Sequence, residues 1–418
     1  MKVLWFTNIM LPSACEYLGI PASKAGGWME ALRVNLERYF PEIDLHIASF
    51  SIAKFKPFHI GNATYYAIKK DRQSGRIKYI LRNWKHTRYS DKELMECNDL
   101  VDICKPDLIH VHGSENLFGL VQETTSIPVI ISLQGILMSY QSFCFPGIGF
   151  TDRLRIERLS EFVKGRSLTH LEIEEKNQAR IEERICSNCK YFLGRTEWDK
   201  SIALLMNPNA SYYSVGEILR EPFYSTSWDN SNLKKQIVFA TISSGLRKGI
   251  LVLLDAIGIL RRKGFKNVNL RLAGSIKNQI TWPLVTRHIT KNEIKQNVTF
   301  LGALNAKELA IELSQSSVFV HPSFIDNSPN SLAEAMLVGT PCVATAVGGV
   351  LSMLENNKDG LLCTPGDPYS LAVGIGTILR EEKHSFEFSR KAQIRANARH
   401  NRRQIVQDLV LAYEKTVM

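Results

Sequence analysis

The stretch from Val318 to Gly349 constrains the fold of this chain more than any other. It begins with an apolar run that ends at His321-Pro322, and a polar loop follows. Ser331 to Leu337 then has the pattern of a helix that ends at Gly339. Strand, loop and helix in this order are typical of an open parallel sheet, in which ligands bind at the carboxyl ends of strands, beside helix N-termini. The stretch therefore predicts a site for an anionic group such as a diphosphate.

Two acidic residues of this stretch are candidates for contacts with a sugar. Asp326 lies in the loop before the helix, and Glu334 lies inside the helix. Carboxylates are poor ligands for phosphate and good acceptors for sugar and ribose hydroxyls. We therefore expect the loop and the helix to bind the two ends of one activated sugar, unless the two acids only cap the helix or form ion pairs. The further donor-binding candidates of this stretch are Asn327, Ser328, Asn330, Ser331 and Leu332.

The same residues carry a resemblance to a known family. Asp326, Glu334, Ala335, Gly339, Pro341, Gly348 and Gly349 stand at the places of the signature of glycosyltransferase family 4, also described as glycosyl transferases group 1. The first acid of that signature is normally Glu, and here it is Asp326. The resemblance implies a retaining enzyme of α/β class and GT-B fold, in which two Rossmann-like, doubly wound parallel-sheet domains face a central cleft. It also implies that Asp326, a catalytic candidate, binds hydroxyls of the transferred sugar, and Glu334 suits the ribose of a nucleotide diphosphate sugar.

Length and composition agree with two domains. A chain of 418 residues with 44% hydrophobic residues is long enough for two cores of ordinary size. Strand and helix patterns alternate before and after a polar aromatic segment, FYSTSWDNSN, which has no helical period. We therefore expect an N-terminal acceptor-binding domain over residues 1–222 and a C-terminal nucleotide-sugar-binding domain over residues 233–385. Residues 386–418 are expected to form helices, which the resemblance implies cross back to the first domain.

The second domain begins with a strand, a loop and a helix that place two cations beside a glycine. Arg247 and Lys248 lie in the loop, and Gly249 leaves room before the helix. The resemblance implies that Lys248 grips the diphosphate, which makes it a catalytic as well as a donor-binding candidate. Arg247 is the candidate for a second cation at the same diphosphate.

Two glycines and an arginine are donor-binding candidates of the first domain. Gly26 and Gly27 stand directly before a helix, where bare backbone lets an anionic group approach, although a plain packing role is an equal alternative. Arg195 ends a short strand before Thr196, which fits a helix N-cap. We expect Arg195 to face the cleft, unless it is only a structural ion-pair partner.

His112 is the catalytic candidate of the first domain. The buried strand LIHVHG places His110 and His112 on the same face, with His112 nearer the carboxyl end. A lone histidine in a strand is more often a satisfied core residue. Here Asp107, His110 and His112 resemble the D-x-x-H-x-H of the family, which implies that His112 lies close to the reacting sugar.

The expected reaction breaks a C1–O bond and releases a diphosphate, so negative charge on the leaving oxygen must be stabilised. The chain contains no Asp-x-Asp, the usual holder of a metal ion in such enzymes. We therefore expect no metal and no cofactor beyond the nucleotide sugar, with Lys248, Arg247 or Arg195 and helix amides as the stabilising groups. Because no carboxylate pair of the glycosidase kind is evident, the acceptor is expected to attack on the leaving-group face, with the departing phosphate as base.

The net charge of +11 points to anionic partners. Residues 69–92 are rich in Lys and Arg and contain Trp84, which indicates either a solvated helical face or a basic amphipathic segment on anionic lipid. No apolar run reaches the length of a membrane span, and the eight cysteines have no regular spacing, as in a reduced compartment. We expect a cytoplasmic protein that can lie at the inner face of the cytoplasmic membrane and act on a saccharide or lipid-linked acceptor.

The sequence leaves two other functions open. A nucleotide-sugar epimerase of the same fold would change the sugar without an acceptor, and a non-catalytic protein would bind sugar or nucleic acid without turnover. The basic residues match no recognised nucleic-acid-binding motif, so no nucleic acid is expected. The favoured function is that of a retaining glycosyltransferase that uses a UDP- or GDP-sugar in the synthesis of a bacterial surface polysaccharide.

Overall fold

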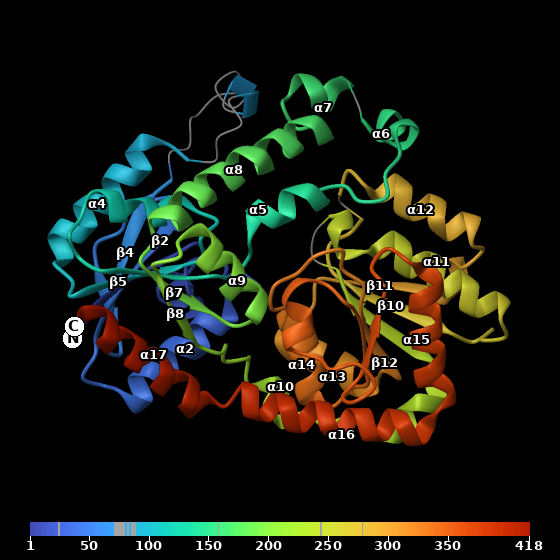
Figure 1. Ribbon diagram of the computed structural model, residues 1–418. Coiled ribbons are helices and arrows are strands. Elements are labelled where there is room, and N and C mark those ends of the chain that lie inside the picture. Colours follow the sequence, from blue (N-terminus) through green and yellow to red (C-terminus); the bar gives the residue numbers. More distant parts are fainter. Residues whose placement is uncertain are drawn as a thin grey trace. The chain divides into compact units, whose positions relative to one another are not determined.

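The structure of the chain, a computed structural model, divides into two compact units. Unit 1 consists of Met1–Ser142, Arg158–Ile218 and His400–Met418, and unit 2 consists of Phe143–Glu157 and Leu219–Arg399. The described residues are 1–23, 26–70, 80, 81, 83, 84, 89–157, 159–242, 245–277 and 279–418. Figure 1 shows the helices and strands of both units, coloured along the sequence.

A mostly parallel sheet forms the centre of unit 1. Its strands are β1 (Lys2–Thr7), β2 (Asp44–Ser51), β3 (Phe58–Ile60), β4 (Ala63–Lys69), β5 (Leu108–His112), β6 (Val129–Ser132), β7 (Tyr191–Gly194) and β8 (Ser211–Ser214). They lie in the order β3-β4-β2-β1-β5-β6-β7-β8, and β3 pairs with β4 in the antiparallel sense. Along β1, Trp5 packs in one apolar cluster and its neighbours Leu4 and Phe6 in another. The sheet is therefore buried on both faces, which accounts for its nearly continuous apolar strands.

Helices cover both faces of this sheet (Figure 1). The helices of unit 1 include α1 (Pro12–Tyr17), α2 (Gly27–Tyr39), α4 (Asp91–Cys104), α5 (Leu137–Tyr140), α7 (Leu159–Val163), α8 (Leu168–Asn188), α9 (Glu197–Met206), α17 (Arg402–Val417) and the 3-10 helix η1 (Leu117–Glu123). Leu36 of α2 and Leu409 of α17 pack in the cluster of Trp5. Phe118 of η1 and Ile185 of α8 pack in the cluster on the other face.

Unit 2 is built around a second parallel sheet. Its strands are β9 (Ile237–Thr241), β10 (Asn269–Ala273), β11 (Val298–Gly302), β12 (Val318–His321), β13 (Cys342–Thr345) and β14 (Leu361–Cys363), in the order β11-β10-β9-β12-β13-β14. Its helices include α6 (Phe150–Ile156), α10 (Pro222–Ser225), α11 (Ile250–Arg262), α12 (Trp282–Lys291), α13 (Ala306–Gln315), α14 (Asn330–Val338), α15 (Pro368–Arg380) and α16 (Glu382–Arg399), with the 3-10 helices η3 (Asn230–Lys235), η4 (Leu246–Lys248), η5 (Lys295–Asn297) and η6 (Gly348–Ser352). Two α/β units with parallel sheets confirm the fold class that the sequence predicted.

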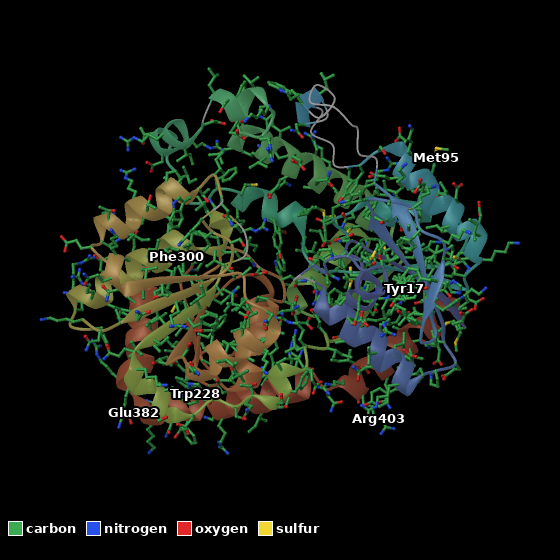
Figure 2. All side chains as sticks on the ribbon, turned by 180° about the vertical axis from the view of Figure 1, so that it is seen from behind. Tyr17, Met95, Trp228, Phe300, Glu382 and Arg403 are labelled. Atoms are coloured by element: carbon green, nitrogen blue, oxygen red, sulfur yellow. The ribbon has the colours of Figure 1, made fainter. Side chains whose placement is uncertain are left out.

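The boundary between the units lies between Ile218 and Leu219, before the segment that the sequence indicated as a linker. Leu219 and Phe223 are buried in the apolar core of unit 2. Trp228, labelled in Figure 2, donates from Nε1 to the carbonyl oxygen of Ser316 at 2.7 Å. The aromatic side chains of this segment therefore anchor it to unit 2, although it has no helical period.

Two further segments differ from the expected division. Residues 143–157 belong to unit 2, where Arg287 of α12 pairs with Asp152 of α6. Helix α16 also belongs to unit 2, because Ala392 is buried in the core of that unit. The chain therefore returns to unit 1 at His400 and not at residue 386.

Substitution of Phe223 tests whether the expected linker is part of unit 2. Phe223→Ala should lower the free energy of unfolding of unit 2 by about 3–5 kcal/mol, because it opens a cavity at a side chain that is 0% exposed. Urea unfolding followed by circular dichroism measures the change, and Ser225→Ala in the same helix is the control. A Phe223→Ala protein that unfolds like this control would show that the segment is not part of the core.

Candidate functional site

The loops after strands β9 and β12 meet where the order of the unit 2 sheet reverses. The chain continues from β9 to β10 on one side, and from β12 to β13 on the other, while β9 and β12 are neighbours. Such a reversal leaves a crevice at the carboxyl ends of the two strands, and ligands bind there in open α/β sheets. Lys248 follows β9 and Asp326 follows β12, so both catalytic candidates of unit 2 lie at this crevice.

Backbone contacts fix these two loops against each other. Gly249 has a φ of 72°, and a Cβ atom at this position would lie 1.8 Å from the carbonyl oxygen of Pro322. The amide of Phe324 donates to the carbonyl oxygen of Arg247 at 2.8 Å. Glycine is therefore required directly after Lys248, because no side chain fits between the loops. Arg247 itself is half-buried in the short helix η4.

A buried carboxylate holds Lys248 at the crevice. The Nζ atom of Lys248 lies 2.5 Å from Oδ2 of Asp326, and Nε2 of His321 lies 3.1 Å from the same oxygen. Ser323 Oγ donates to Oδ2 at 3.5 Å, and the amide of Asn327 donates to Oδ1 at 3.2 Å. The carboxylate of Asp326 is thus surrounded by donors of this chain, and it positions the Lys248 ammonium.

The same contacts determine the protonation states of Asp326 and His321. Burial alone would raise the pKa of Asp326, but the Lys248 charge and the His321 hydrogen bond outweigh it and hold the pKa below its ordinary value. Burial lowers the pKa of His321, although Asp326 opposes this shift. At neutral pH Asp326 is therefore ionised, and a neutral His321 lies beside it, with Nε2 3.1 Å from Oδ2.

The first turn of α14 gives one of its candidate amides an acceptor within the protein. The helix runs from Asn330 to Val338, close to the predicted range, and ends at Gly339. The amide of Leu332 donates to the carbonyl oxygen of Pro329 at 3.0 Å, and its side chain is buried in the core. That N–H therefore has an acceptor within the turn, and a contact of the Leu332 amide with the donor stays a prediction.

The other donor-binding candidates of this stretch lie near the N-terminus of α14. Asn327 is buried, whereas Ser328, Asn330 and Ser331 are half-buried. The first-turn amides of a helix lack intrahelical acceptors and carry a partial positive charge. An anion at this end of α14 would therefore meet both amide dipoles and half-buried polar side chains.

Glu334 has a partner that sequence reasoning missed. Arg220 donates from Nε and Nη2 to Oε1 of Glu334, at 3.0 and 2.6 Å. Burial raises the pKa of Glu334 to about 7, against the opposing charge of Arg220. The guanidinium of Arg220 also lies over the ring of Phe223, 5.0 Å from its centroid. Arg220 lies just before the segment FYSTSWDNSN and stands in no motif, so no pattern in the sequence indicated it.

Unit 1 has its own reversal of strand order, between β1 and β5. The chain runs from β1 to β2 on one side, and from β5 to β6 on the other. His112 ends β5, and Gly26 and Gly27 open α2 in the connection after β1. Gly26 has a φ of 87°, which explains a glycine at the helix N-cap without any ligand.

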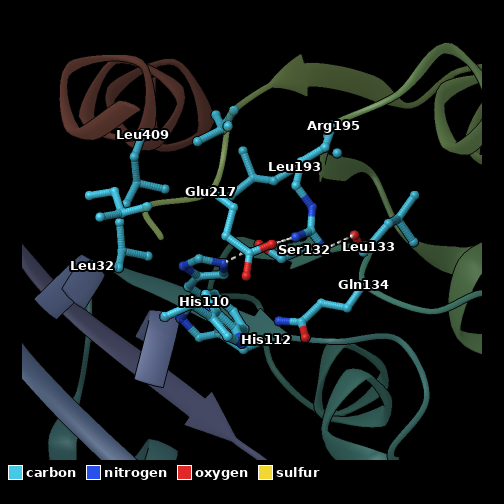
Figure 3. Close-up of a pocket in the computed structure, with 15 residues that line it drawn as sticks. Leu32, His110, His112, Ser132, Leu133, Gln134, Leu193, Arg195, Glu217 and Leu409 are labelled. Carbon is cyan, nitrogen blue, oxygen red and sulfur yellow. Dashed lines mark hydrogen bonds and ion pairs between the residues drawn. The ribbon is translucent and has the colours of Figure 1, made fainter. Parts of the chain in front are cut away.

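A pocket opens at this reversal within unit 1. Residues that line it include Trp28, Leu32, His112, Ser132, Arg195 and Leu409 (Figure 3). The two glycines are not among its lining residues, whereas the adjacent Trp28 is. Apolar walls and a few convergent polar groups are typical of small-molecule sites.

The imidazole of His112 lines the pocket without a hydrogen bond to the described residues. It is 1% exposed, and neither ring nitrogen has a hydrogen-bond partner among the described residues. The rings of Trp5, Trp28 and His110 surround it at centroid distances of 4.6, 5.7 and 3.9 Å. Burial, reinforced by the charge of Arg195, lowers the pKa of His112 to about 3. A neutral His112 therefore has one N–H donor and one bare nitrogen without partners among the described residues, in a side chain that lines the pocket.

Arg195 lies in the same pocket and forms an ion pair with Glu217. Its Nη2 atom also donates to the carbonyl oxygen of Leu133 at 3.2 Å, and burial lowers its pKa. Thr196 accepts from the amide of Asp199 at 3.1 Å, which confirms the predicted N-cap of α9. The structure thus shows Arg195 in the ion-pair role that the sequence left as the alternative, and its partner Glu217 was not anticipated.

The expected membrane segment lies largely outside the described residues. Of residues 69–92, the structure describes 69, 70, 80, 81, 83, 84 and 89–92. Trp84 is 43% exposed and donates from Nε1 to the carbonyl oxygen of Val163 in α7 at 3.1 Å. Leu159, at the start of α7, is 79% exposed. Among the described residues, no helix is long and apolar enough to cross a lipid bilayer.

The candidates thus form separate groups. Lys248, Asp326 and the N-terminus of α14 lie at the crevice of unit 2, and His112 and Arg195 lie in the pocket of unit 1. In the part of the chain that the structure describes, no group of three or more His, Cys, Asp or Glu side chains is arranged to hold a metal ion.

The raised pKa of Glu334 predicts how the stability of unit 2 depends on pH. The ordinary pKa of 4.5 applies to the unfolded chain, and the folded value is about 7. Between these values the unfolded state has lost a proton that the folded state retains, so stability falls with rising pH by about 3 kcal/mol in total and then stays constant. Urea unfolding of the wild type and of Glu334→Gln measures the difference, which should grow in favour of Gln across this window. The same pH dependence in both proteins would contradict the assignment.

The sequence of this chain resembles those of known glycosyltransferases over part of its length. Residues 226–399 match the family described as Glycosyl transferases group 1. The D-inositol 3-phosphate glycosyltransferase of Pseudarthrobacter chlorophenolicus is 30% identical over 151 residues, which are 36% of this chain and 36% of the relative. The amylovoran biosynthesis glycosyltransferase AmsK of Erwinia amylovora is 27% identical over 135 residues, which are 30% of this chain and 32% of the relative. The chain thus matches about a third of the length of each of these curated relatives.

Solved structures resemble the chain over nearly its whole length. Sucrose-phosphate synthase of Thermosynechococcus elongatus has a TM-score of 0.71 at 16% identity, with 99% of this chain and 98% of that chain covered. Anabaena HepE, solved in complex with UDP and glucose, has a TM-score of 0.67 at 14% identity, with 99% of each chain covered. The chain therefore has the GT-B fold of these proteins, as the sequence predicted.

Proposed function

We propose that this protein is a retaining glycosyltransferase of family 4, which moves a sugar from a nucleotide diphosphate sugar, a UDP- or GDP-sugar, to a saccharide or lipid-linked saccharide. The observation that carries the proposal is the Lys248 ammonium, which Asp326 holds at the crevice of the unit 2 sheet. The family match over residues 226–399 covers this crevice. HepE, which shares the fold, was solved with UDP and glucose, which supports a nucleotide sugar as donor.

The proposed chemistry needs cations at the leaving group and no protein nucleophile. The bond between C1 of the sugar and the diphosphate oxygen breaks, and a bond between C1 and the acceptor oxygen forms on the same face. The acceptor hydroxyl gives its proton to the departing phosphate. Lys248 and the amides of the first turn of α14 stabilise the charge that grows on the diphosphate, and charge-assisted hydrogen bonds strengthen as that charge develops. The reaction is proposed to need no metal ion.

The other candidates take supporting roles in this proposal. Glu334 accepts from the ribose hydroxyls, and Arg220 holds its carboxylate in place. The loop residues Asn327, Ser328 and Asn330 contact the transferred sugar. In unit 1, the neutral His112 offers hydrogen bonds to an uncharged group of a substrate, and Arg195 is held by Glu217. Asp326 acts chiefly by positioning Lys248, and its contact with the sugar remains a prediction.

We place the reaction in the synthesis of a bacterial surface polysaccharide on a lipid carrier. The relative from Erwinia amylovora is named for amylovoran biosynthesis, which supports this context. A lipid-linked acceptor would require the enzyme to approach the inner face of the cytoplasmic membrane. The net charge of +11 would favour contact with anionic lipid headgroups.

Substitution of Lys248 tests the proposed chemistry. Lys248→Ala should reduce turnover by about 100- to 1,000-fold, the range found when one stabilising donor of a developing anion is removed. Sugar transfer is followed with radiolabelled UDP- and GDP-sugars, and Lys263→Ala, which removes an exposed lysine after α11, is the control. Turnover equal to that of the control would contradict the role of Lys248. Loss of activity on addition of a chelator would contradict the proposal that the reaction needs no metal ion.

The same assay separates the two alternative functions. A labelled sugar that appears on an acceptor identifies a transferase, whereas a changed sugar with no acceptor product identifies an epimerase. Protection against thermal unfolding by UDP or GDP, without any turnover, would identify a binding protein. A nucleotide at 100 times its dissociation constant should add about 2.7 kcal/mol to the free energy of unfolding.

Substitution of exposed apolar residues beside the basic segment tests whether the protein binds anionic membranes. Trp84→Ser and Leu159→Ser should each weaken binding to vesicles that contain phosphatidylglycerol, since each removes an exposed apolar side chain from one surface of unit 1. Flotation with vesicles measures binding. Leu205→Ser in α9 removes a side chain that is 72% exposed elsewhere, and it serves as the control. Equal flotation of all three variants would remove this surface from the proposal.

A further inference from the structure

A chain of buried hydrogen bonds connects the last helix to the floor of the unit 1 pocket. The Nε1 atom of Trp5 donates to the hydroxyl of Tyr413 in α17 at 2.9 Å. The same hydroxyl lies 2.6 Å from Nδ1 of His110, and Nε2 of His110 lies 2.6 Å from Oγ of Ser132. Trp5, Tyr413 and His110 are each at most 1% exposed, whereas Ser132 lines the pocket (Figure 3).

Only one assignment of donors and acceptors is consistent along this series of hydrogen bonds. An indole N–H can only donate, so the Tyr413 oxygen accepts from Trp5 and keeps one hydrogen of its own. If His110 also donated to Tyr413, that hydrogen would be buried without an acceptor among the described residues, at a cost of about 1–3 kcal/mol. Tyr413 therefore donates to Nδ1 of His110, and His110 donates from Nε2 to Ser132.

A charged His110 would change this direction, but its surroundings oppose the charge. Burial lowers the pKa of His110, and the adjacent His112 adds to the effect. The imidazole is thus neutral, with its proton on Nε2. The hydroxyl of Ser132 then accepts from His110, so its own hydrogen can be donated to a group other than His110, and Ser132 lines the pocket.

We propose that Tyr413 is a positioning residue that acts through His110 to make the Ser132 hydroxyl a hydrogen-bond donor to an uncharged oxygen of a carbohydrate in the unit 1 pocket. The proposal rests on the proposed function for the identity of the ligand as a carbohydrate. The direction of the relay depends on the protein alone, because its members lie within unit 1.

The charges and walls of the pocket support an uncharged ligand. Arg195 is paired with Glu217, and His112 is neutral beside Ser132, so the pocket offers no cation without a counter-charge among these groups. The Trp28 ring and the Leu32 side chain supply apolar walls. A sugar ring combines an apolar face with hydroxyl and ether oxygens, and these oxygens accept from Ser132 and exchange hydrogen bonds with His112.

The tautomer of His110 tests the relay without any ligand. In protein labelled with [15N]histidine, the ring nitrogen shifts of the wild type should show a proton on Nε2 and a bare Nδ1, with the signals assigned by their loss in His110→Gln. Tyr413→Phe removes the hydroxyl that donates to Nδ1, so the proton should move partly or wholly from Nε2. Thr416→Val, one turn along α17, removes a buried hydroxyl that bonds within the helix and should leave the shifts unchanged. A proton on Nδ1 in the wild type, or wild-type shifts in Tyr413→Phe, would overturn the relay.

Binding of methyl α-D-glucopyranoside tests the ligand class. The glucoside should shift the ring signals of His112, and both Ser132→Ala and Tyr413→Phe should weaken its binding by about two- to twelve-fold, the worth of one hydrogen bond. The double variant should bind no more weakly than Ser132→Ala alone, because both changes remove the same donor. Thr416→Val should bind like the wild type.

The outcomes separate this proposal from the proposed function. Additive losses in the double variant, or shifts of His112 with inorganic phosphate and none with the glucoside, would overturn the assignment of Ser132 to an uncharged oxygen. An enzyme that transfers sugar but lacks the relay refutes only the role of Tyr413. A protein that shows the relay and binds the glucoside, but transfers no sugar, refutes only the proposed transferase activity.

Discussion

A charge that is buried in a protein must be paired, because an isolated ion loses its hydration at a cost that no packing contact offsets. This constraint shapes each candidate site of the chain. Asp326 is ionised in the core of unit 2 because Lys248 and His321 face it. Arg195 is buried in unit 1 because Glu217 faces it. Burial raises the pKa of Glu334 towards neutrality even though Arg220 pairs with it.

The parallel sheets place these pairs where they can act on a ligand. In each unit, neighbouring strands whose connections leave in opposite directions open a crevice at their carboxyl ends. The sequence predicted this much, because apolar strands alternate with helices, because Lys248 and Asp326 follow strands, and because His112 ends one. It also predicted the N-cap at Thr196 and the approximate range of α14, since both depend on residues that are close in the chain.

Features that depend on residues far apart in the chain were not predicted. Arg220 contacts Glu334, which lies 114 positions later in the sequence, and Tyr413 contacts His110, which lies 303 positions earlier. Neither arginine nor tyrosine stands in a motif, so no local pattern distinguishes it from other residues of its type. The unit boundary was misplaced for a related reason, because Phe223 is buried by unit 2 although its own segment has no helical period.

The length of the side chain at position 326 accounts for the difference between the expected and the observed role of this acid. The Asp326 carboxylate stays close to its own backbone, where the amide of Asn327 and the hydroxyl of Ser323 bind its two oxygens. A glutamate would carry its oxygens one methylene farther from this backbone and out of that set of donors. Aspartate therefore favours contacts with the loop and with Lys248. In this chain the acid pairs with the Lys248 ammonium, and in the function that we propose this ammonium stabilises the leaving group.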